Sequence, residues 1–147
     1  MKLGIGCDHG AYEYKTEIVE MLQEQGHEVI DCGCYDRKSV DYPDYAEKVA
    51  NLVVAGDVDL GIVMCGTGIG ISMAANKIKG IRCGLCTNTT MARLTREHND
   101  ANMLALGQRT TGIEVAKDIV NTFVNTEFSY GERHQKRIKK LHDLEEC

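Results

Sequence analysis

The sequence lacks a long hydrophobic run and an internal linker. No stretch approaches the roughly 18 consecutive apolar residues of a membrane-spanning helix, and no charged segment followed by an apolar core stands at the N-terminus. No segment rich in Pro, Gly or Ser divides the 147 residues, and none is of low complexity. We therefore expect one domain, residues 1–147, in the cytoplasm and without a membrane partner.

An excess of positive charge is also missing. The 17 Lys and Arg are outnumbered by 22 Asp and Glu, which gives a net charge of -5 and argues against nucleic acid as a partner. The seven cysteines are an odd number, and a reducing compartment would leave them as free thiols. The basic residues that suit a small anion gather near the C-terminus, at Arg133, His134, Lys136, Arg137, Lys139 and Lys140.

Short apolar runs alternate with segments of helical periodicity. Strands are predicted at 2–7, 28–32, 60–65, 82–86 and 103–106, and helices at 12–25, 43–55, 71–77, 89–98 and 112–125. This alternation predicts an α/β fold, a single Rossmann-like domain whose five-stranded parallel sheet is covered by helices on both faces. A last helix at about 133–147 carries a narrow apolar seam, and we expect it to pack on a partner subunit.

The strongest local signal is a strand that ends in a thiol. Cys65 is followed by Gly66, Gly68 and Gly70, which lead into a helix. Such glycines are common in close strand-to-helix turns, where they permit positive φ. Amides at a helix start can also bind an anion and lower the pKa of a nearby thiol, and we favour this functional interpretation.

Other uses of cysteines and glycine loops do not fit. A dinucleotide fingerprint follows the first strand and reads G-x-G-x-x-G, a nucleotide phosphate loop needs Gly-Lys-Ser/Thr, and neither pattern is present here. A cysteine phosphatase needs an arginine shortly after the thiol, but the next arginine after Cys65 is Arg82. Cys83 and Cys86 spell C-x-x-C, but positions three apart in a strand point to opposite faces, so we expect neither a metal nor a disulfide there.

Further polar residues stand near predicted strand ends. Asp8 and His9 end the first strand, Cys65 ends the third, and His98 lies just before the fifth. Because strands one and three end at one rim of a parallel sheet, we expect these residues to converge on one site. Arg133 and Arg137 are one helical turn apart and can face a single anion, although charge alone is more typical of a solvated helix face.

A series of motifs runs along nearly the whole chain: Gly6-Cys7-Asp8-His9, Asp41-Tyr42-Pro43, Cys65-Gly66-Thr67-Gly68-Ile69-Gly70, Ala74-Ala75-Asn76-Lys77, Arg96-Glu97-His98-Asn99-Asp100 and Gly131-Glu132-Arg133-His134-Gln135. Their content and order resemble ribose-5-phosphate isomerase type B and the related galactose-6-phosphate isomerase subunits. The resemblance implies a small-molecule sugar phosphate as ligand and a homodimer or larger homo-oligomer with sites at subunit boundaries. It also implies that neither a cofactor nor a metal takes part.

The resemblance further implies a role for each site residue. Cys65 is the expected base, because the glutamate that replaces it in one branch of the family corresponds to Ile71, which cannot act as a base. His98 is the expected ring-opening acid, with Asp8 as a helper. Phosphate contacts are expected from His9, Arg133 and Arg137, and sugar contacts from Tyr42, Asn99 and Arg109.

The reaction itself requires a base beside two carbons and donors for a developing oxyanion, because an aldose and a ketose interconvert through an enediolate. We expect those donors to be the Thr67 hydroxyl and the backbone amides of the loop, from Gly66 and Thr67 through Gly68 and Ile69 to Gly70. Two alternatives stay open. The substrate could be a six-carbon sugar phosphate, allose 6-phosphate or galactose 6-phosphate, or the domain could bind a phosphosugar without turnover.

Overall fold

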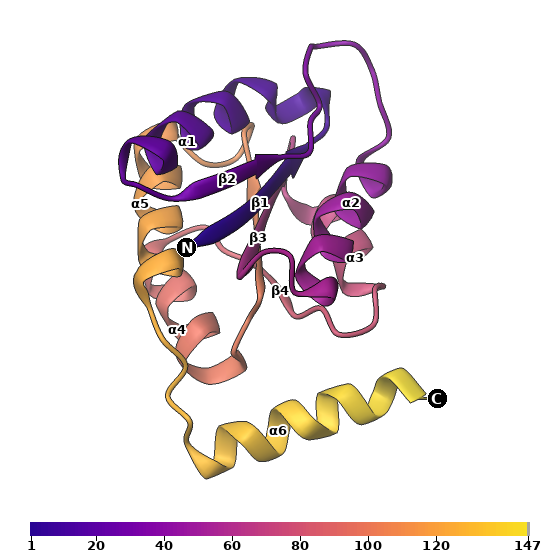
Figure 1. Ribbon diagram of the computed structural model, residues 1–147, viewed down its shortest axis with the longest axis vertical. Coiled ribbons are helices and arrows are strands. Elements are labelled where there is room, and N and C mark those ends of the chain that lie inside the picture. Colours follow the sequence, from indigo (N-terminus) through magenta and orange to yellow (C-terminus); the bar gives the residue numbers. More distant parts are fainter. Residues whose placement is uncertain (147) are drawn as a thin grey trace.

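The computed structural model describes residues 1–146 and shows an α/β fold (Figure 1). The strands are β1 (Lys2–Cys7), β2 (Glu28–Asp31), β3 (Leu60–Cys65), β4 (Cys83–Leu85) and β5 (Met103–Gly107). The helices are α1 (Tyr12–Glu24), α2 (Tyr42–Ala55), α3 (Ile69–Asn76), α4 (Thr89–Asn99), α5 (Ile113–Asn125) and α6 (Glu132–Asp143), with short 3-10 turns η1 (His9–Ala11) and η2 (Leu144–Glu146). The predicted alternation of strands and helices is confirmed, with boundaries shifted by a few residues.

All five strands are parallel, in the order β2-β1-β3-β5-β4. Helices α2 and α3 cover one face of the sheet, and α1, α4 and α5 cover the other (Figure 1). Successive strand residues alternate between the two cores: Ile62 and Met64 belong to the α1 side, whereas Val63 and Cys65 belong to the α2 side. Period-two alternation therefore gives each face its own apolar core.

Two glycines allow α2 to approach the sheet closely. A Cβ at Gly6 of β1 would lie 2.8 Å from a methyl group of Val49, and a Cβ at Gly61 of β3 would lie 2.7 Å from the other. Any larger residue at these positions would push α2 away. The close approach brings the first turn of α2, with Tyr42, next to the loop that follows β3, where a Cβ at Gly70 would lie 2.8 Å from the Tyr42 ring.

The direction of the strand order reverses between β1 and β3. From β1 the chain continues to β2 on one side, and it later adds β3 on the other side. Ligands of open α/β sheets bind at such a switch point, outside the carboxyl ends of the two strands. Here the N–H of Asp8, just after β1, donates to the carbonyl of Met64 in β3 at 3.2 Å, so these two strand ends are tied together.

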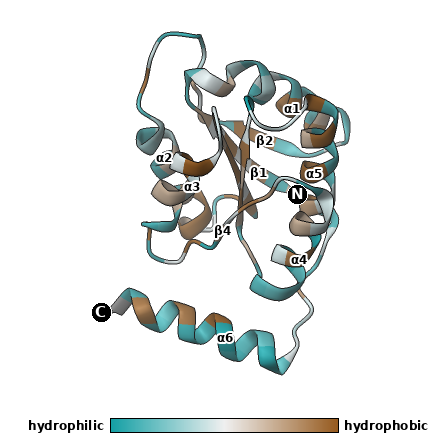
Figure 2. Cartoon of the chain, turned by 180° about the vertical axis from the view of Figure 1, so that it is seen from behind, coloured by the Kyte–Doolittle hydropathy of each residue, from teal (hydrophilic) through white to brown (hydrophobic). Residues whose placement is uncertain are grey.

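The C-terminal helix stands apart from the layers. Figure 1 shows α6 as an arm beyond one edge of the sheet, and none of its residues is buried. It is mostly hydrophilic (Figure 2), but its Leu141 exposes 48% of its surface, and Leu144, in the η2 turn that follows, exposes 68%. The predicted helix of about 133–147 is present, but its α-helical part ends at Asp143. Residue 147 lies outside the described residues. The packing of this helix on a partner subunit stays a prediction.

None of the helices described for residues 1–146 has the length and apolar character that crossing a bilayer requires.

Candidate active site

Cys65 lies at the carboxyl end of β3 with 5% of its surface exposed. Its Sγ accepts a hydrogen bond from the backbone N–H of Gly68 at 3.1 Å. Gly68 has φ +77°, and a Cβ there would lie 2.8 Å from the backbone carbon of Leu106 and 2.7 Å from a methyl of Leu85. Only glycine fits this position, so the turn that directs the N–H toward the thiol depends on it.

The loop amides do not all point into the site. The N–H of Gly68 is directed at Cys65, and the N–H of Ile69 donates to the Thr67 Oγ1 at 3.2 Å. In the part of the chain that the structure describes, the N–H groups of Gly66 and Thr67 have no protein acceptor. The turn thus uses the amides of Gly68 and Ile69 internally, and the expectation that the loop amides are oxyanion donors stays a prediction.

Asp8 and Arg109 lie on the two sides of the Cys65 loop. Asp8 follows β1 and is nearly buried, and its Oδ1 accepts from the N–H of Gly10 at 2.9 Å. Gly10 in turn lies against the loop, since a Cβ on it would be 3.2 Å from the Gly66 nitrogen. From the β5 side, the N–H of Arg109 donates to the Gly66 carbonyl at 2.8 Å, and its side chain passes close to Gly66.

His9 and Tyr42 approach the same rim from the segment before α2. The Nδ1 of His9 accepts a hydrogen bond from the N–H of Val40 at 3.1 Å. The proton of the neutral ring is therefore on Nε2, which can donate a hydrogen bond to a ligand. Tyr42 begins α2 beside Gly70 and is exposed. One rim thus carries the predicted residues Asp8, His9, Tyr42, Cys65, Gly66, Thr67, Gly68, Ile69, Gly70 and Arg109.

A second cluster contains the remaining predicted residues. His98 and Asn99 end α4, and the His98 ring packs on the ring of His134 with centroids 4.5 Å apart. The residues His98, Asn99, His134, Arg137, Ile138 and Leu141 line a cavity of about 350 Å³. Arg133 and Arg137 are exposed on α6.

His134 is a member of this cluster to which the sequence analysis assigned no role of its own. Its Nδ1 lies 2.8 Å from the hydroxyl of Ser129. Desolvation, together with the positive charges of His98, Arg133 and Arg137, lowers the pKa of His134. The signal in the sequence that could have pointed to His134 is its place next to Arg133 in one motif. The spacing of residues does not indicate that its ring stacks on His98, which lies 36 residues earlier in the chain.

The two clusters lie at opposite edges of the sheet. Helix α4 begins after the carboxyl end of β4 and runs back to the amino end of β5, so its last residues face away from Cys65. The expected single site of Asp8, Cys65 and His98 at a subunit boundary stays a prediction. Within one chain, His98, Asn99, Arg133 and Arg137 lie away from Cys65. The physical reason is that a helix between parallel strands must run antiparallel to them.

The two cysteines of the C-x-x-C motif pack in the apolar cores, and the expectation that they form neither a metal site nor a disulfide stays a prediction. Cys83 packs in the core beneath α3, and Cys86 packs in the core on the other face. Burial raises the pKa of Cys83 to about 12 and that of Cys86 to about 11, so both stay protonated at neutral pH. Within residues 1–146, no three His, Cys, Asp or Glu side chains are grouped in a way that could hold a metal ion.

The chain is similar to known proteins over nearly its whole length. Residues 3–141 match the family model described as Ribose/Galactose Isomerase. The chain is 47% identical to ribose-5-phosphate isomerase B of Escherichia coli K12, over 99% of this chain and 97% of that protein, and 40% identical to the galactose-6-phosphate isomerase subunit LacB of Clostridium acetobutylicum, over 98% and 83%. The structure of Clostridium thermocellum ribose-5-phosphate isomerase B superposes with a TM-score of 0.98 at 55% identity, over 99% of this chain and 98% of that one. The chain therefore belongs to the Ribose/Galactose Isomerase family.

Proposed function

We propose that this aldose-ketose isomerase interconverts D-ribose 5-phosphate and D-ribulose 5-phosphate. The observation that carries the proposal is the Cys65 rim at the switch point of the sheet. There a nearly buried thiol lies beside the side chains of Asp8 and Arg109 and a turn in which, among residues 1–146, the N–H groups of Gly66 and Thr67 have no protein acceptor. The similarity to the E. coli and C. thermocellum proteins, both named ribose-5-phosphate isomerase B, supports ribose 5-phosphate as the substrate.

In the proposed mechanism, the Cys65 thiolate is the base. It removes the proton from C2 of the open-chain aldose, which forms an S–H bond and leaves an enediolate. It then returns the proton to C1, while the hydroxyl proton of O2 is transferred to O1, so that C2 becomes the carbonyl carbon of the ketose. No oxidant or reductant is consumed, because the electron pair only moves within the substrate. The N–H of Gly68 interacts favourably with negative charge on the sulfur, and the N–H groups of Gly66 and Thr67 serve as donors to the enediolate oxygen.

The complete site is proposed to form between two chains. The edge of one chain that carries His98, Asn99, Arg133 and Arg137 would cover the Cys65 rim of a second chain. Exposed apolar residues on both surfaces support this arrangement: Ile69 and Met73 lie on α3 next to the Cys65 loop, and Leu141 and Leu144 lie at the end of the arm. In a symmetric dimer each chain would present both surfaces, so the contact between the α6 edge of one chain and the Cys65 rim of the other would form twice.

Each residue then has a role in that shared site. His98 of one chain protonates the ring oxygen so that the sugar opens, assisted by Asp8 of the other. His9, Arg133 and Arg137 hold the phosphate, and Tyr42, Asn99 and Arg109 contact the sugar. Thr67 supplies a further hydroxyl, which already accepts from the Ile69 amide and can donate to the substrate.

We propose the cytoplasm as the compartment. The six cysteines within residues 1–146 are free thiols, and a reducing environment keeps thiols in this state. The Cys65 mechanism requires neither a metal nor a cofactor. An assay in excess chelator tests this part of the proposal directly.

The test is turnover of ribose 5-phosphate by purified protein with and without EDTA, beside allose 6-phosphate and galactose 6-phosphate. Chelator-resistant formation of ribulose 5-phosphate, with kcat/KM at least about tenfold above that for either six-carbon substrate, supports the proposal. Galactose 6-phosphate is the second candidate, because the relative LacB is named for it. Binding of phosphosugars without turnover of any would identify a non-catalytic domain instead.

A further inference from the structure

A mostly buried arginine connects the end of α4 to α6. Arg82 precedes β4, and its side chain is 15% exposed. Its Nε donates to the carbonyls of Asn99 at 3.1 Å and Asp100 at 3.0 Å, and its Nη2 donates to the Asp100 carbonyl at 2.7 Å. Its Nη1 lies 2.6 Å from the Nε2 of His142 on α6. One guanidinium thus spans the two elements that carry the second cluster.

The contact assigns the tautomer of His142. A guanidinium can only donate, so Nε2 of His142 accepts and Nδ1 carries the proton. That Nδ1 lies 3.2 Å from the Oε1 of Glu145, and the same oxygen accepts from the N–H of Gly80 at 3.0 Å. A continuous polar chain therefore runs from the end of α4 through Arg82, His142 and Glu145 back to the loop before β4.

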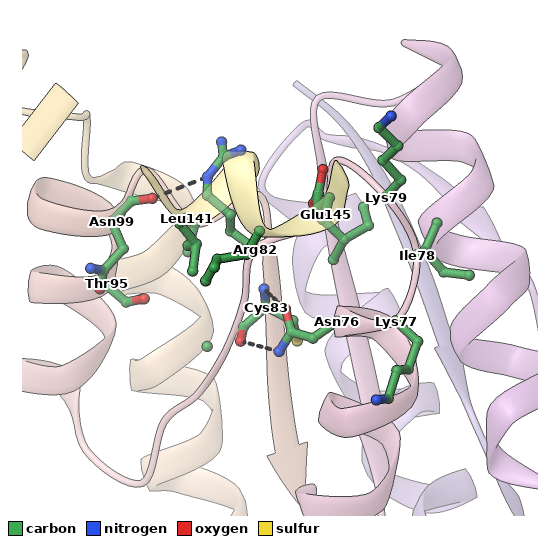
Figure 3. Close-up of a pocket in the computed structure, with 14 residues that line it drawn as sticks. Asn76, Lys77, Ile78, Lys79, Arg82, Cys83, Thr95, Asn99, Leu141 and Glu145 are labelled. Carbon is green, nitrogen blue, oxygen red and sulfur yellow. Dashed lines mark hydrogen bonds between the residues drawn. The ribbon is translucent and has the colours of Figure 1, made fainter. Parts of the chain in front are cut away.

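This end of α6 lies at the surface. No residue of α6 is buried, and a cavity of about 790 Å³ opens beneath it, lined in part by Arg82, Leu141, Leu144 and Glu145 (Figure 3). Figure 3 shows Arg82 joined to Asn99 by the dashed line, with Leu141 and Glu145 beside the same cavity. The first turn of α6 is attached separately, where His134 stacks on His98. Two attachment points define the direction of a helix, and Arg137 lies between them.

The anchor on α4 is itself rigidly held. Asp100 ends α4 with φ 45°, a left-handed conformation that needs support in a non-glycine residue. Arg96 supplies it, since its Nη1 contacts the Asp100 Oδ1 at 3.1 Å and the Ala101 carbonyl at 2.6 Å, while its Nε donates to the Thr126 carbonyl at 3.0 Å. The carbonyls that Arg82 binds are therefore fixed relative to His98 and Asn99.

We infer that Arg82 and His142 form a latch that sets the direction of α6 and so positions Arg133 and Arg137 relative to His98 and Asn99. His142 is a positioning residue in this scheme, because it acts through the arginines and not on the substrate. The inference rests on the proposed function, in which these arginines bind the substrate phosphate.

The first test compares three substitutions near the end of α6. His142→Ala removes the acceptor for Arg82, and His142→Gln supplies an amide oxygen that can accept in its place. Asp143→Ala is the matched control, because Asp143 is exposed and pairs with Lys139 one turn earlier on α6. We expect His142→Ala to lower kcat/KM for ribose 5-phosphate about tenfold, mainly through KM. Free ribose lacks the phosphate, so we expect the parent protein to turn it over far more slowly, and His142→Ala should leave that rate unchanged. His142→Gln should stay within about threefold of the parent protein and Asp143→Ala within about twofold.

A double-mutant cycle shows whether His142 acts through the two arginines. In an Arg133→Ala, Arg137→Ala background, His142→Ala should lower kcat/KM less than about threefold further, since both arginines that it positions are already gone. A full tenfold additional loss in that background, or an equal loss for His142→Gln and His142→Ala, overturns the latch.

Hydrogen exchange tests whether the latch holds α6 in place, without a measurement of activity. The amides of 132–143 should exchange at least about tenfold faster in His142→Ala than in Asp143→Ala, and unchanged exchange overturns the inference. Failure of the proposed function is recognised separately: if Arg137→Ala alone leaves the preference for ribose 5-phosphate over free ribose unchanged, the phosphate is bound elsewhere, whatever the exchange experiment shows.

Discussion

The backbone N–H of Gly68 points at the sulfur of Cys65 from 3.1 Å, three residues further along the chain. This contact exists because Gly68 adopts φ +77° in a space that admits no side chain. A thiol at a strand end becomes a candidate base through this turn, because the turn supplies a fixed dipole that no side-chain motion can remove.

Replacing Cys65 by Ala should abolish isomerisation while phosphosugar binding is retained, because the base is lost and the loop amides and arginines remain. Loss of a general base usually costs 10²-fold or more, so we expect less than about 1% of the parent kcat. Steady-state kinetics with ribose 5-phosphate and calorimetric binding measure the two quantities. Cys83→Ala is the matched control, since Cys83 is a half-buried thiol at the start of β4, away from the carboxyl ends of the strands. Activity above that level would remove Cys65 from the role of base.

Replacing Gly68 by Ala should impair both stability and turnover. A Cβ in the left-handed region costs about 1–2 kcal/mol, and the contact with Leu106 should add to that cost and displace the N–H from Cys65. Gly26→Ala is a suitable control, because Gly26 has φ +90° but nothing within 4 Å of a Cβ. We expect it to lose about 1 kcal/mol of unfolding free energy without a change in kcat. Equal kcat values for the two variants would contradict a role for the Gly68 turn in catalysis.

Mixing two inactive variants should restore activity if the site is shared between chains. Cys65→Ala keeps His98, and His98→Asn keeps Cys65, so a mixed dimer contains one site with both groups. Random reassociation gives about half mixed dimers with one intact site of two, and therefore about a quarter of parental activity. The measurement is turnover after co-refolding equal amounts of the two variants. No recovery, with mixed dimers demonstrated by mass spectrometry, would argue that each chain builds its site alone.

Replacing Arg137 by Ala should affect only phosphorylated substrate. We expect a loss on the order of 2 kcal/mol in kcat/KM for ribose 5-phosphate, the scale of a lost charge-assisted contact, because phosphate binding positions the sugar. The low activity on free ribose should hardly change. The ratio of kcat/KM for the two substrates is the quantity to compare. An equal loss on both substrates would instead mean that Arg137 supports the assembly of the protein.

The sequence predicted the elements of this fold well, since local patterns decide them. Period-two and helical spacing located all five strands and the helices between them, and the Cys65 motif was placed correctly at a strand end. The order of the strands was not predicted. The sheet places β5 between β3 and β4, and this depends on contacts between residues far apart in the chain, which no local pattern encodes.

The candidate site divides in the same way. The residue types alone determined the chemistry that is available: a thiol, two histidines, arginines one turn apart and a glycine turn. Only the tertiary structure decided that Cys65 and His98 lie at opposite edges of the sheet, because a helix between parallel strands returns to the edge where the next strand begins. It also decided that Gly68, and not the whole loop, directs its amide at the sulfur, since that depends on how closely β5 packs against the turn.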